Sequence, residues 1–366
     1  MLIINIVYEV KSEMGKEQIE KYNSLVGQTP FSFFNKIDSP IVIFDYYQKY
    51  ICDWLKKEIE ENKLNVDFKV EYLKNECVDA ACCFNGKELK LVIFEGTILK
   101  IHKIASVLGC VYETVKTKNK AVDQPITDFF VDYGDAFKTS IIVSDFADNN
   151  IITDYISMIA IKIIIAHEIG HLVNGHIQYL REHGDENINF LMANTVSKTD
   201  KKTLQVMEVD ADHYAALYLF SVIQNELISD ENLNSILLNQ DQIYTLIGSA
   251  IQTVFYLIGI KNDYWKTEHP LHFTHPPALT RLSMFLCCLE WRLGKEHKKE
   301  YKQILQGVIV AQKNIYAYFG TDFLDGNQFV RDIAGIDKHG IFLMNELEKM
   351  FDIFFAFQKK PLIELY

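Results

Sequence analysis

The chain has 366 residues, a formal net charge of −12, and a hydrophobic content of 49%. This hydrophobic content, with only 17 glycines and 7 prolines, excludes a disordered protein and predicts a sizeable packed core. The acidic balance, without a stripe of lysine and arginine, argues against a nucleic-acid partner.

The cysteines indicate a reducing compartment. There are seven, an odd number, and they include the adjacent pairs Cys82–Cys83 and Cys287–Cys288. This pattern fits neither a disulfide framework nor a Cys-x-x-Cys zinc site. Free thiols account for it, so we expect a cytoplasmic protein.

The first third of the chain mixes strand and helix signals. Met1–Tyr8 lacks a basic segment and predicts a strand rather than a signal peptide. Apolar runs predict strands at residues 2–7, 41–44, 66–70 and 89–94, with helical runs at 46–61 and 98–115. We therefore expect an α/β region over residues 1–122, which ends in a polar stretch before Pro125.

The remainder is expected to be mainly helical. A strand at residues 139–144 and an acidic loop lead to a helix that begins near Thr153 and stops at Asn174–Gly175. Further helices are predicted at residues 203–225, 241–260 and 277–293, and the tail from Lys295 is helical apart from a turn-rich break at 320–340.

Two apolar stretches need separate treatment because they resemble membrane spans. Residues 155–166 are too few to cross a bilayer, and residues 244–260 carry Ser249, Gln252 and Thr253. Core helices account for both stretches, and no membrane span is expected.

The helix that begins near Thr153 carries the most informative pattern, His167-Glu168-Ile169-Gly170-His171. Two histidines four residues apart lie on one helix face, where they can share a metal ion, and Glu168 can reach a water bound to that ion. The alternative is a helix whose histidines contact only side chains or solvent. Residues 159–166 favour the metal, because they are apolar almost all round and predict a buried helix, where unpaired polar groups are costly.

A catalytic zinc needs a third protein ligand from elsewhere. His176 follows His171 by five positions instead of the six of the three-histidine motif, so we expect it past the helix end, exposed or hydrogen-bonded. Glu208 on the next helix is favoured over Asp212 or His213. Asp212 shares the face of Glu208 and is suited to accept the N–H of a ligating histidine, whereas Asp210 points away and is expected to be solvated. The alternative for these carboxylates is the acidic face of a solvated helix.

Three blocks then occur in order: His167-Glu-x-x-His171, Glu208-x-x-Ala211-Asp212, and Thr274-His275-Pro276-Pro277-x-x-x-Arg281. Over about residues 155–290 the chain resembles gluzincin zinc metallopeptidases of the CAAX prenyl-protease and HtpX type, and most of all the Lit-like phage-exclusion peptidases. The resemblance implies a zinc endopeptidase with one Zn²⁺ per chain. It implies His167, His171 and Glu208 as ligands, Glu168 as catalytic base and Asp212 as the partner of a ligating histidine.

The resemblance also implies that His275 and Arg281 line the cleft as catalytic residues. His275 would donate a hydrogen bond to the oxyanion, and Arg281 would brace His275 or the substrate backbone. The alternative is an Xaa-Pro-Pro turn that caps the following helix.

The fold expected is α+β. It consists of the mixed α/β part at residues 1–122, a mainly helical zincin-type metallopeptidase core at 123–295 and a helical C-terminal extension at 296–366. Within the core, the strand at 139–144 is suited to pair with an extended substrate, although an ordinary sheet strand is compatible with the same residues.

The Lit-like resemblance implies a conditional intracellular protease whose target is a host protein such as elongation factor Tu. Its partners would be a protein or peptide substrate and an activating protein or peptide. The rival hypothesis is a sensor or binding module whose zinc is not catalytic, although the presence of Glu168 favours the enzyme.

Overall fold

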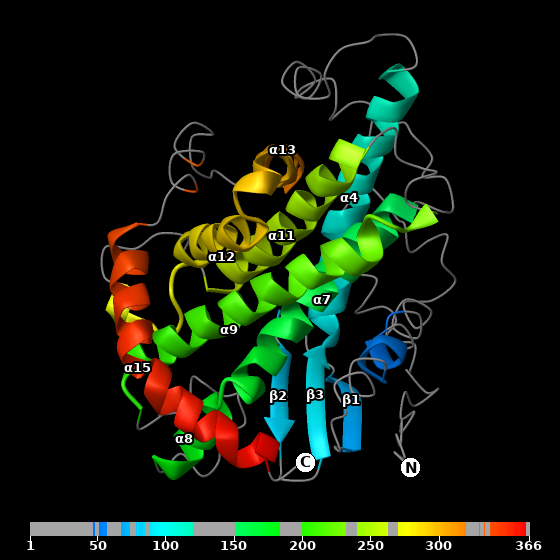
Figure 1. Cartoon of the computed structure of the whole chain (residues 1–366). Coiled ribbons are helices and arrows are strands. Elements are labelled where there is room, and N and C mark those ends of the chain that lie inside the picture. Colours follow the sequence, from blue (N-terminus) through cyan, green and yellow to red (C-terminus); the bar gives the residue numbers. More distant parts are fainter. Residues whose placement is uncertain are drawn as a thin grey trace.

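The structure is a computed structural model of the whole chain, and helices make up most of what it describes (Figure 1). The description covers Tyr47, Val78, Phe329, Ile333 and residues 51–56, 67–73, 80–84, 88–119, 151–183, 199–231, 240–262, 270–319 and 337–363. The strands predicted at 2–7, 41–44 and 139–144 lie outside these residues. The α+β prediction is confirmed, with a small sheet in the N-terminal part and a helical remainder.

The sheet has three strands in the order β1-β3-β2. β1 (Asp67–Leu73) runs parallel to β3 (Glu88–Phe94), and β2 (Ala80–Phe84) pairs antiparallel with β3. β1 and β3 agree with the predicted strands at 66–70 and 89–94, whereas β2 was not predicted. Because β3 lies in the centre, its successive residues Leu91, Val92, Ile93 and Phe94 are all buried, without the alternation of a one-sided strand.

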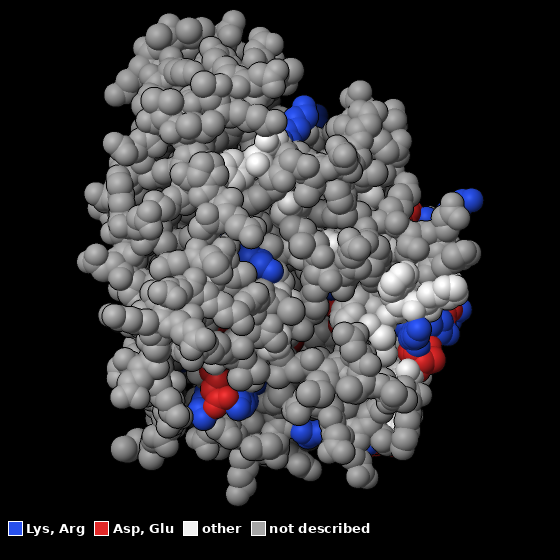
Figure 2. All heavy atoms as spheres, turned by 180° about the vertical axis from the view of Figure 1, so that it is seen from behind, with Lys and Arg blue, Asp and Glu red and all other residues white. Residues whose placement is uncertain are grey.

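Charged side chains at the surface gather in small groups of mixed sign where the described residues reach it (Figure 2). On the sheet, for example, Glu71 forms ion pairs with both Lys69 and Lys90. Surface pairs of this kind contribute little to stability, so the fold depends on the buried contacts described next.

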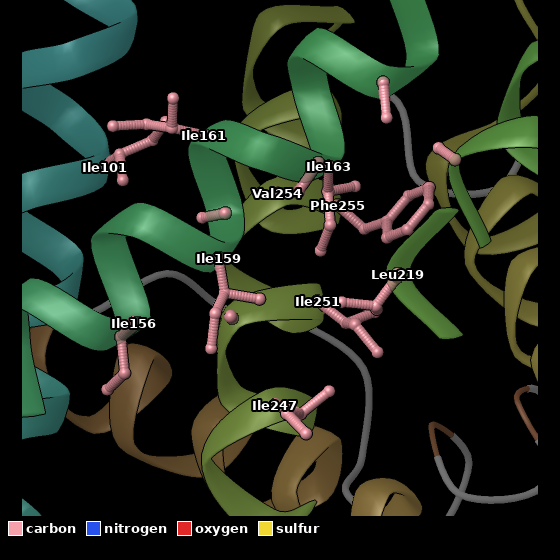
Figure 3. Packing of buried hydrophobic residues seen from close by; sticks show 14 of the residues in the cluster. Ile101, Ile156, Ile159, Ile161, Ile163, Leu219, Ile247, Ile251, Val254 and Phe255 are labelled. Atoms are coloured by element: carbon pink, nitrogen blue, oxygen red, sulfur yellow. The ribbon is translucent and has the colours of Figure 1, made fainter. Parts of the chain in front are cut away.

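The main core forms around α7 (Ile151–Val173). Isoleucines on several sides of this helix point into the cluster, where they meet side chains from three other helices (Figure 3). These helices are α4 (Glu95–Asn119), α9 (Lys201–Val222) and α11 (Gln240–Asn262). Examples are Ile156, Ile159, Ile161 and Ile163 of α7, Ile101 of α4, Leu219 of α9, and Ile251 of α11. Contacts on several sides explain why α7 is apolar almost all round.

Among the described helices, two are long and apolar enough to cross a membrane by length and composition, namely residues 152–173 and 241–259. In the structure, 67% and 94% of their apolar windows are buried inside the protein. Helices buried in a protein core pass the same test, so the criterion alone does not distinguish a core helix from a span.

The C-terminal part adds three helices. α12 (Ala278–Leu293) packs on α9, and α13 (Lys298–Phe319) lies along α11. α15 (Lys338–Ile363) crosses α9 and the short helix α8 (His176–Glu182) (Figure 1). A second cluster fills these crossings: Leu180, Val206, Met207, Val209, Met284, Leu343, Leu347 and Phe354. The main cluster draws residues from all three predicted segments, and the boundaries near 122 and 295 stay predictions.

Candidate metal centre

The two motif histidines lie near the C-terminal end of α7, one turn apart and both buried. Their rings are nearly perpendicular, at 89°, and their Nε2 atoms are 3.2 Å apart. The helix ends at Asn174–Gly175, as predicted, because Gly175 adopts a φ of 80°, which glycine tolerates and other residues rarely adopt.

The crossing helix α9 brings Glu208 to the same point. This helix begins at Asp200, whose carboxylate accepts a hydrogen bond from the Thr203 backbone N–H. At Gly170 the helices approach closely, since a Cβ there would lie 3.1 Å from the Cα of Ala211. Of the three carboxyl and imidazole candidates on α9, the structure places Glu208 beside both histidines, rather than Asp212 or His213.

The spacing of the three side chains suits a metal ion. One carboxylate oxygen of Glu208 lies 3.5 Å from His167 Nε2, and the other lies 3.5 Å from His171 Nε2. The two Nε2 atoms are 3.2 Å apart, close to the separation of about 3.3–3.4 Å between two ligands of a tetrahedral zinc ion. One ligand atom from each of the three residues lies within 4.8 Å of the others, so these residues could bind a metal ion.

The groups at the centre also suit a divalent cation. Glu168, Glu208 and Asp212 are each at least nine-tenths buried, and Arg281 is buried beside the latter two. Glu208 and Asp212 both pair with the Arg281 guanidinium, and both lie against His167. Imidazole and carboxylate groups are the usual protein ligands of a dication such as Zn²⁺.

Glu208 and Asp212 of α9 are both held in their ionised form. Burial by itself would raise the pKa of Glu208, but His275, Arg281 and His167 hold it well below its usual range. Burial likewise opposes ionisation of Asp212, and Arg281 with His167 outweighs it and lowers the pKa of Asp212. Both groups are therefore available as anions at neutral pH.

Asp212 lies where an acceptor for a ligating histidine is expected. Its Oδ1 is 2.9 Å from His167 Nδ1, so the Nδ1–H donates to it, and a neutral His167 would present its Nε2 lone pair to the centre. Burial disfavours the charged imidazole, but Asp212 and Glu208 outweigh burial and raise the pKa of His167 to about 9. For His171, burial is the largest influence, and it lowers the pKa well below the usual range.

Arg281 lies between Glu208 and Asp212 of α9, an arrangement that the sequence did not indicate. Its Nε and one Nη donate to the two oxygens of Asp212 at 2.7 and 2.8 Å. The other Nη lies 3.0 Å from Glu208. The side chain is only 4% exposed, so its charge acts at low dielectric.

His275 lies beside Glu208 and is partly buried, with 24% of its side chain exposed. Its Nε2 is 3.5 Å from Glu208, and its Nδ1 is 2.9 Å from the Thr274 hydroxyl. Gln205 of α9 donates to the Phe273 carbonyl at 2.8 Å and fixes the segment before it. The oxyanion role of His275 and the proton transfer by Glu168 stay predictions.

Two residues near the centre differ from expectation. Asp210 was expected to be solvated, and this is wrong: its carboxylate lies 3.0 Å from His176 Nε2 and its side chain is 17% exposed. His176 is hydrogen-bonded, as one of the two predicted alternatives, but it is wholly buried at the start of α8. Helix α8 was not predicted, because Asn174–Gly175 indicates a helix end and nothing after it indicates a new helix.

Comparison with known proteins associates this part of the chain with proteolysis. Residues 134–298 match the family model of Peptidase U49, which spans less than half of the chain. No curated protein and no solved structure matches the chain. The matched segment contains every residue of the candidate metal centre, and it agrees with the Lit-like resemblance of the motifs.

Proposed function

We propose that the protein is a zinc-dependent endopeptidase that cleaves an intracellular protein in the cytoplasm. One observation supports this proposal above others: one ligand atom each from His167, His171 and Glu208 lies within 4.8 Å of the others, in a segment similar to a peptidase family. The similarity indicates a peptidase, and the donor set indicates the metal.

His167, His171 and Glu208 would hold the ion through two nitrogens and a carboxylate. When bound there, Zn²⁺ supplies a Lewis acid for the scissile carbonyl and an acidified water. Two imidazoles and one carboxylate are the ligand set of several zinc hydrolases, and three protein ligands leave a position for water.

Glu168 is the residue we assign to proton transfer. It follows His167 directly on α7 and is 8% exposed, so it is a buried glutamate adjacent in sequence to a candidate ligand. Its carboxylate takes a proton from the attacking water and passes it to the leaving amine.

His275 and Arg281 have different parts in this proposal. His275 is partly exposed beside Glu208, and its Nε2–H would donate to the oxyanion of the tetrahedral intermediate. Arg281 is paired with Asp212 and Glu208, so it positions the ligand set and keeps both carboxylates ionised. We also propose that the peptidase depends on an activating protein or peptide and cleaves one target protein. These two points rest only on the resemblance of the motifs to the Lit-like peptidases.

The test separates the metal from the chemistry. Purified protein is expected to contain about one zinc per chain. Glu168→Gln should retain the zinc and lose proteolysis, because the amide is close in shape but cannot accept the proton. Substrates can be sought by comparing new peptide N-termini in cells that express wild type or Glu168→Gln. Glu182→Gln, at the exposed last residue of α8, is a control that retains activity.

The rival hypothesis, a zinc-containing sensor or binding module, gives the opposite result. If Glu168→Gln leaves every cellular effect of the protein intact while zinc is retained, the protein is not acting as a peptidase. Proteolysis that persists in this variant would overturn the role of Glu168.

A further inference from the structure

His171 contacts a buried histidine on the side of its ring that faces away from the metal centre. Its Nε2 lies toward His167 and Glu208, and its Nδ1 lies 3.0 Å from His176 Nδ1. His176 Nε2 in turn lies 3.0 Å from the Asp210 carboxylate. The three side chains form a row from the metal centre to the second residue after Glu208 on α9.

We infer that His176 and Asp210 are positioning residues that fix the tautomer and the ring orientation of His171; this inference rests on the proposed zinc site. A neutral imidazole carries one N–H. When His171 binds a metal through Nε2, its proton must be on Nδ1, and His176 must accept it with Nδ1. His176 then carries its own proton on Nε2 and donates it to Asp210, so every proton in the row has a defined place.

The row is shielded from water, which strengthens its hydrogen bonds. His176 is fully buried and Asp210 is mostly buried. The ring of Phe354, from α15, packs edge-on against the His176 ring with centroids 4.8 Å apart. A helix from the far end of the chain therefore covers the row.

The spacing of five residues between His171 and His176 explains why this histidine is not a ligand. The left-handed residue Gly175 reverses the chain after only one residue, Asn174, and α8 begins at once with His176. The Asn174 side chain also donates to the Asp210 carbonyl and ties this turn to α9. As a result the His176 ring meets the Nδ1 side of His171. A third metal ligand would instead have to lie on the Nε2 side of His171, where the metal would bind.

The two ligating histidines are thus supported differently. His167 donates directly to Asp212, whereas His171 reaches its carboxylate through another imidazole. Partners of ligating histidines typically change metal affinity by about 10- to 100-fold when removed. The same range is expected for the removal of His176, although His176 touches no metal.

The experiment measures zinc affinity, by competition between the full-length protein and a chelator, for wild type and three variants. His176→Leu removes the acceptor and should weaken zinc binding about 10- to 100-fold. His176→Gln offers an amide oxygen to His171 and should recover much of this loss. Asp210→Asn keeps a neutral acceptor for His176 and should have a smaller effect than His176→Leu.

Phe354→Leu is the matched control, because it changes the packing against His176 but removes no hydrogen bond. It should lower the melting temperature of the zinc-free protein and leave zinc affinity unchanged. Nitrogen-15 NMR of the zinc-bound wild type should show His176 protonated on Nε2 only.

The outcomes are distinguishable from those for the proposed function. If wild type binds zinc and His176→Leu binds it equally well, the positioning role is wrong and the peptidase proposal is unaffected. If Phe354→Leu and His176→Leu lose affinity equally, the row acts only through packing, and the inference fails. If wild type does not bind zinc, both proposals are overturned.

Discussion

Two helix crossings in this protein bury polar groups beside a glycine, and they bury them in different ways. Where α7 crosses α9 at Gly170, the buried groups are charged or titratable, and they converge on one point. Where α11 crosses α13 at Gly248 and Gly307, the buried polar groups are neutral: Ser249, Gln252, Thr253 and Gln312.

The neutral groups are mostly satisfied within their own helices. The hydroxyls of Ser249 and Thr253 donate to backbone carbonyls one turn earlier, and Gln252 pairs with Gln312 across the crossing. At the α7–α9 crossing, by contrast, Arg281 and His167 keep Glu208 and Asp212 ionised, and Glu208 converges with the two motif histidines. Burial of polar groups is thus not by itself a sign of function, whereas ionised groups with converging ligand atoms are a stronger one.

The largest expected effect comes from removal of the buried cation. Arg281→Met leaves Asp212 and Glu208 without their guanidinium and should lower the free energy of unfolding of the zinc-free protein by about 3–5 kcal/mol. Denaturant unfolding with a chelator present measures this change, and zinc should restore part of it, because a dication supplies the missing positive charge.

Arg292→Met on the same helix is the control. Arg292 is exposed and lies over the Phe220 ring, so its loss should cost less than about 1 kcal/mol. Equal losses for the two arginines would show that the α7–α9 crossing does not depend on charge compensation.

The next effect concerns the close approach of α11 and α13. A Cβ at Gly248 would lie 2.0 Å from the backbone oxygen of Ile304, so the helices must separate to admit Gly248→Ala. We expect a loss of about 3 kcal/mol, the upper end of the usual range for overpacking. Zinc affinity of the folded variant should not change. The adjacent Ser249→Ala adds no volume and is the control in the same denaturant titration.

Gly170→Ala tests the same geometry at the charged crossing. Its Cβ would meet Ala211 and Tyr214 at 3.1 Å, which a small shift relieves, and alanine favours the helix by about 1 kcal/mol. Stability should therefore change little, but the shift moves His171 relative to Glu208 and should weaken zinc binding. If Gly170→Ala strongly lowers stability and leaves zinc affinity unchanged, the glycine at the α7–α9 crossing acts only in helix packing, as expected for Gly248.

Acidity should also distinguish the crossings, because only one of them titrates. His167 has a pKa raised to about 9 in the folded chain, mainly because its carboxylate partners outweigh burial. A raised pKa stabilises the fold fully below the ordinary value near 6.5, and this stability is lost as pH rises through about 9. The zinc-free protein should lose on the order of 2 kcal/mol over this interval.

Unfolding by denaturant at pH 6, 7.5 and 9 measures this loss, and His167→Gln should flatten the profile between pH 6.5 and 9. If the free energy of unfolding changes equally with pH in wild type and in His167→Gln, groups other than His167 cause the pH dependence.

Much of the metal centre could be predicted from the sequence, because its ligands follow local periodicity. His167 and His171 share a face at a spacing of four, and the helix end at Gly175 follows from composition. The pairing of Asp210 with His176 could not be predicted, since it depends on α8 turning back onto α9. The position of Arg281 was missed for the same reason: only the packing of α12 on α9 brings it to Asp212.

The fold shows a similar division. Long apolar runs predicted α7, α11 and the central strand β3, where one pattern extends over many residues. Strand β2 was not predicted because Ala80–Phe84 is short and its pairing partner β3 comes later in the chain. The α11–α13 crossing depends on Gly248 and Gly307, which are far apart in sequence and uninformative singly.

The smallest effect on stability is expected from the pair Gln252 and Gln312. Changes to this pair test whether its buried polar groups are needed for stability or are only tolerated in the core. Gln252 donates to Gln312, while Gln252 Oε1 and Gln312 Nε2 have no partner among the described residues. Gln312→Leu alone should cost about 1–2 kcal/mol, because it leaves the Gln252 amide buried without its acceptor. Replacing both by leucine removes the desolvated groups together and should bring stability back to within about 1 kcal/mol of wild type. A double-mutant cycle from denaturant unfolding gives the coupling. If the losses of the two single variants add up in the double variant, each glutamine stabilises the fold by itself. The polar groups at the α11–α13 crossing would then be needed for stability, as those at the α7–α9 crossing are expected to be.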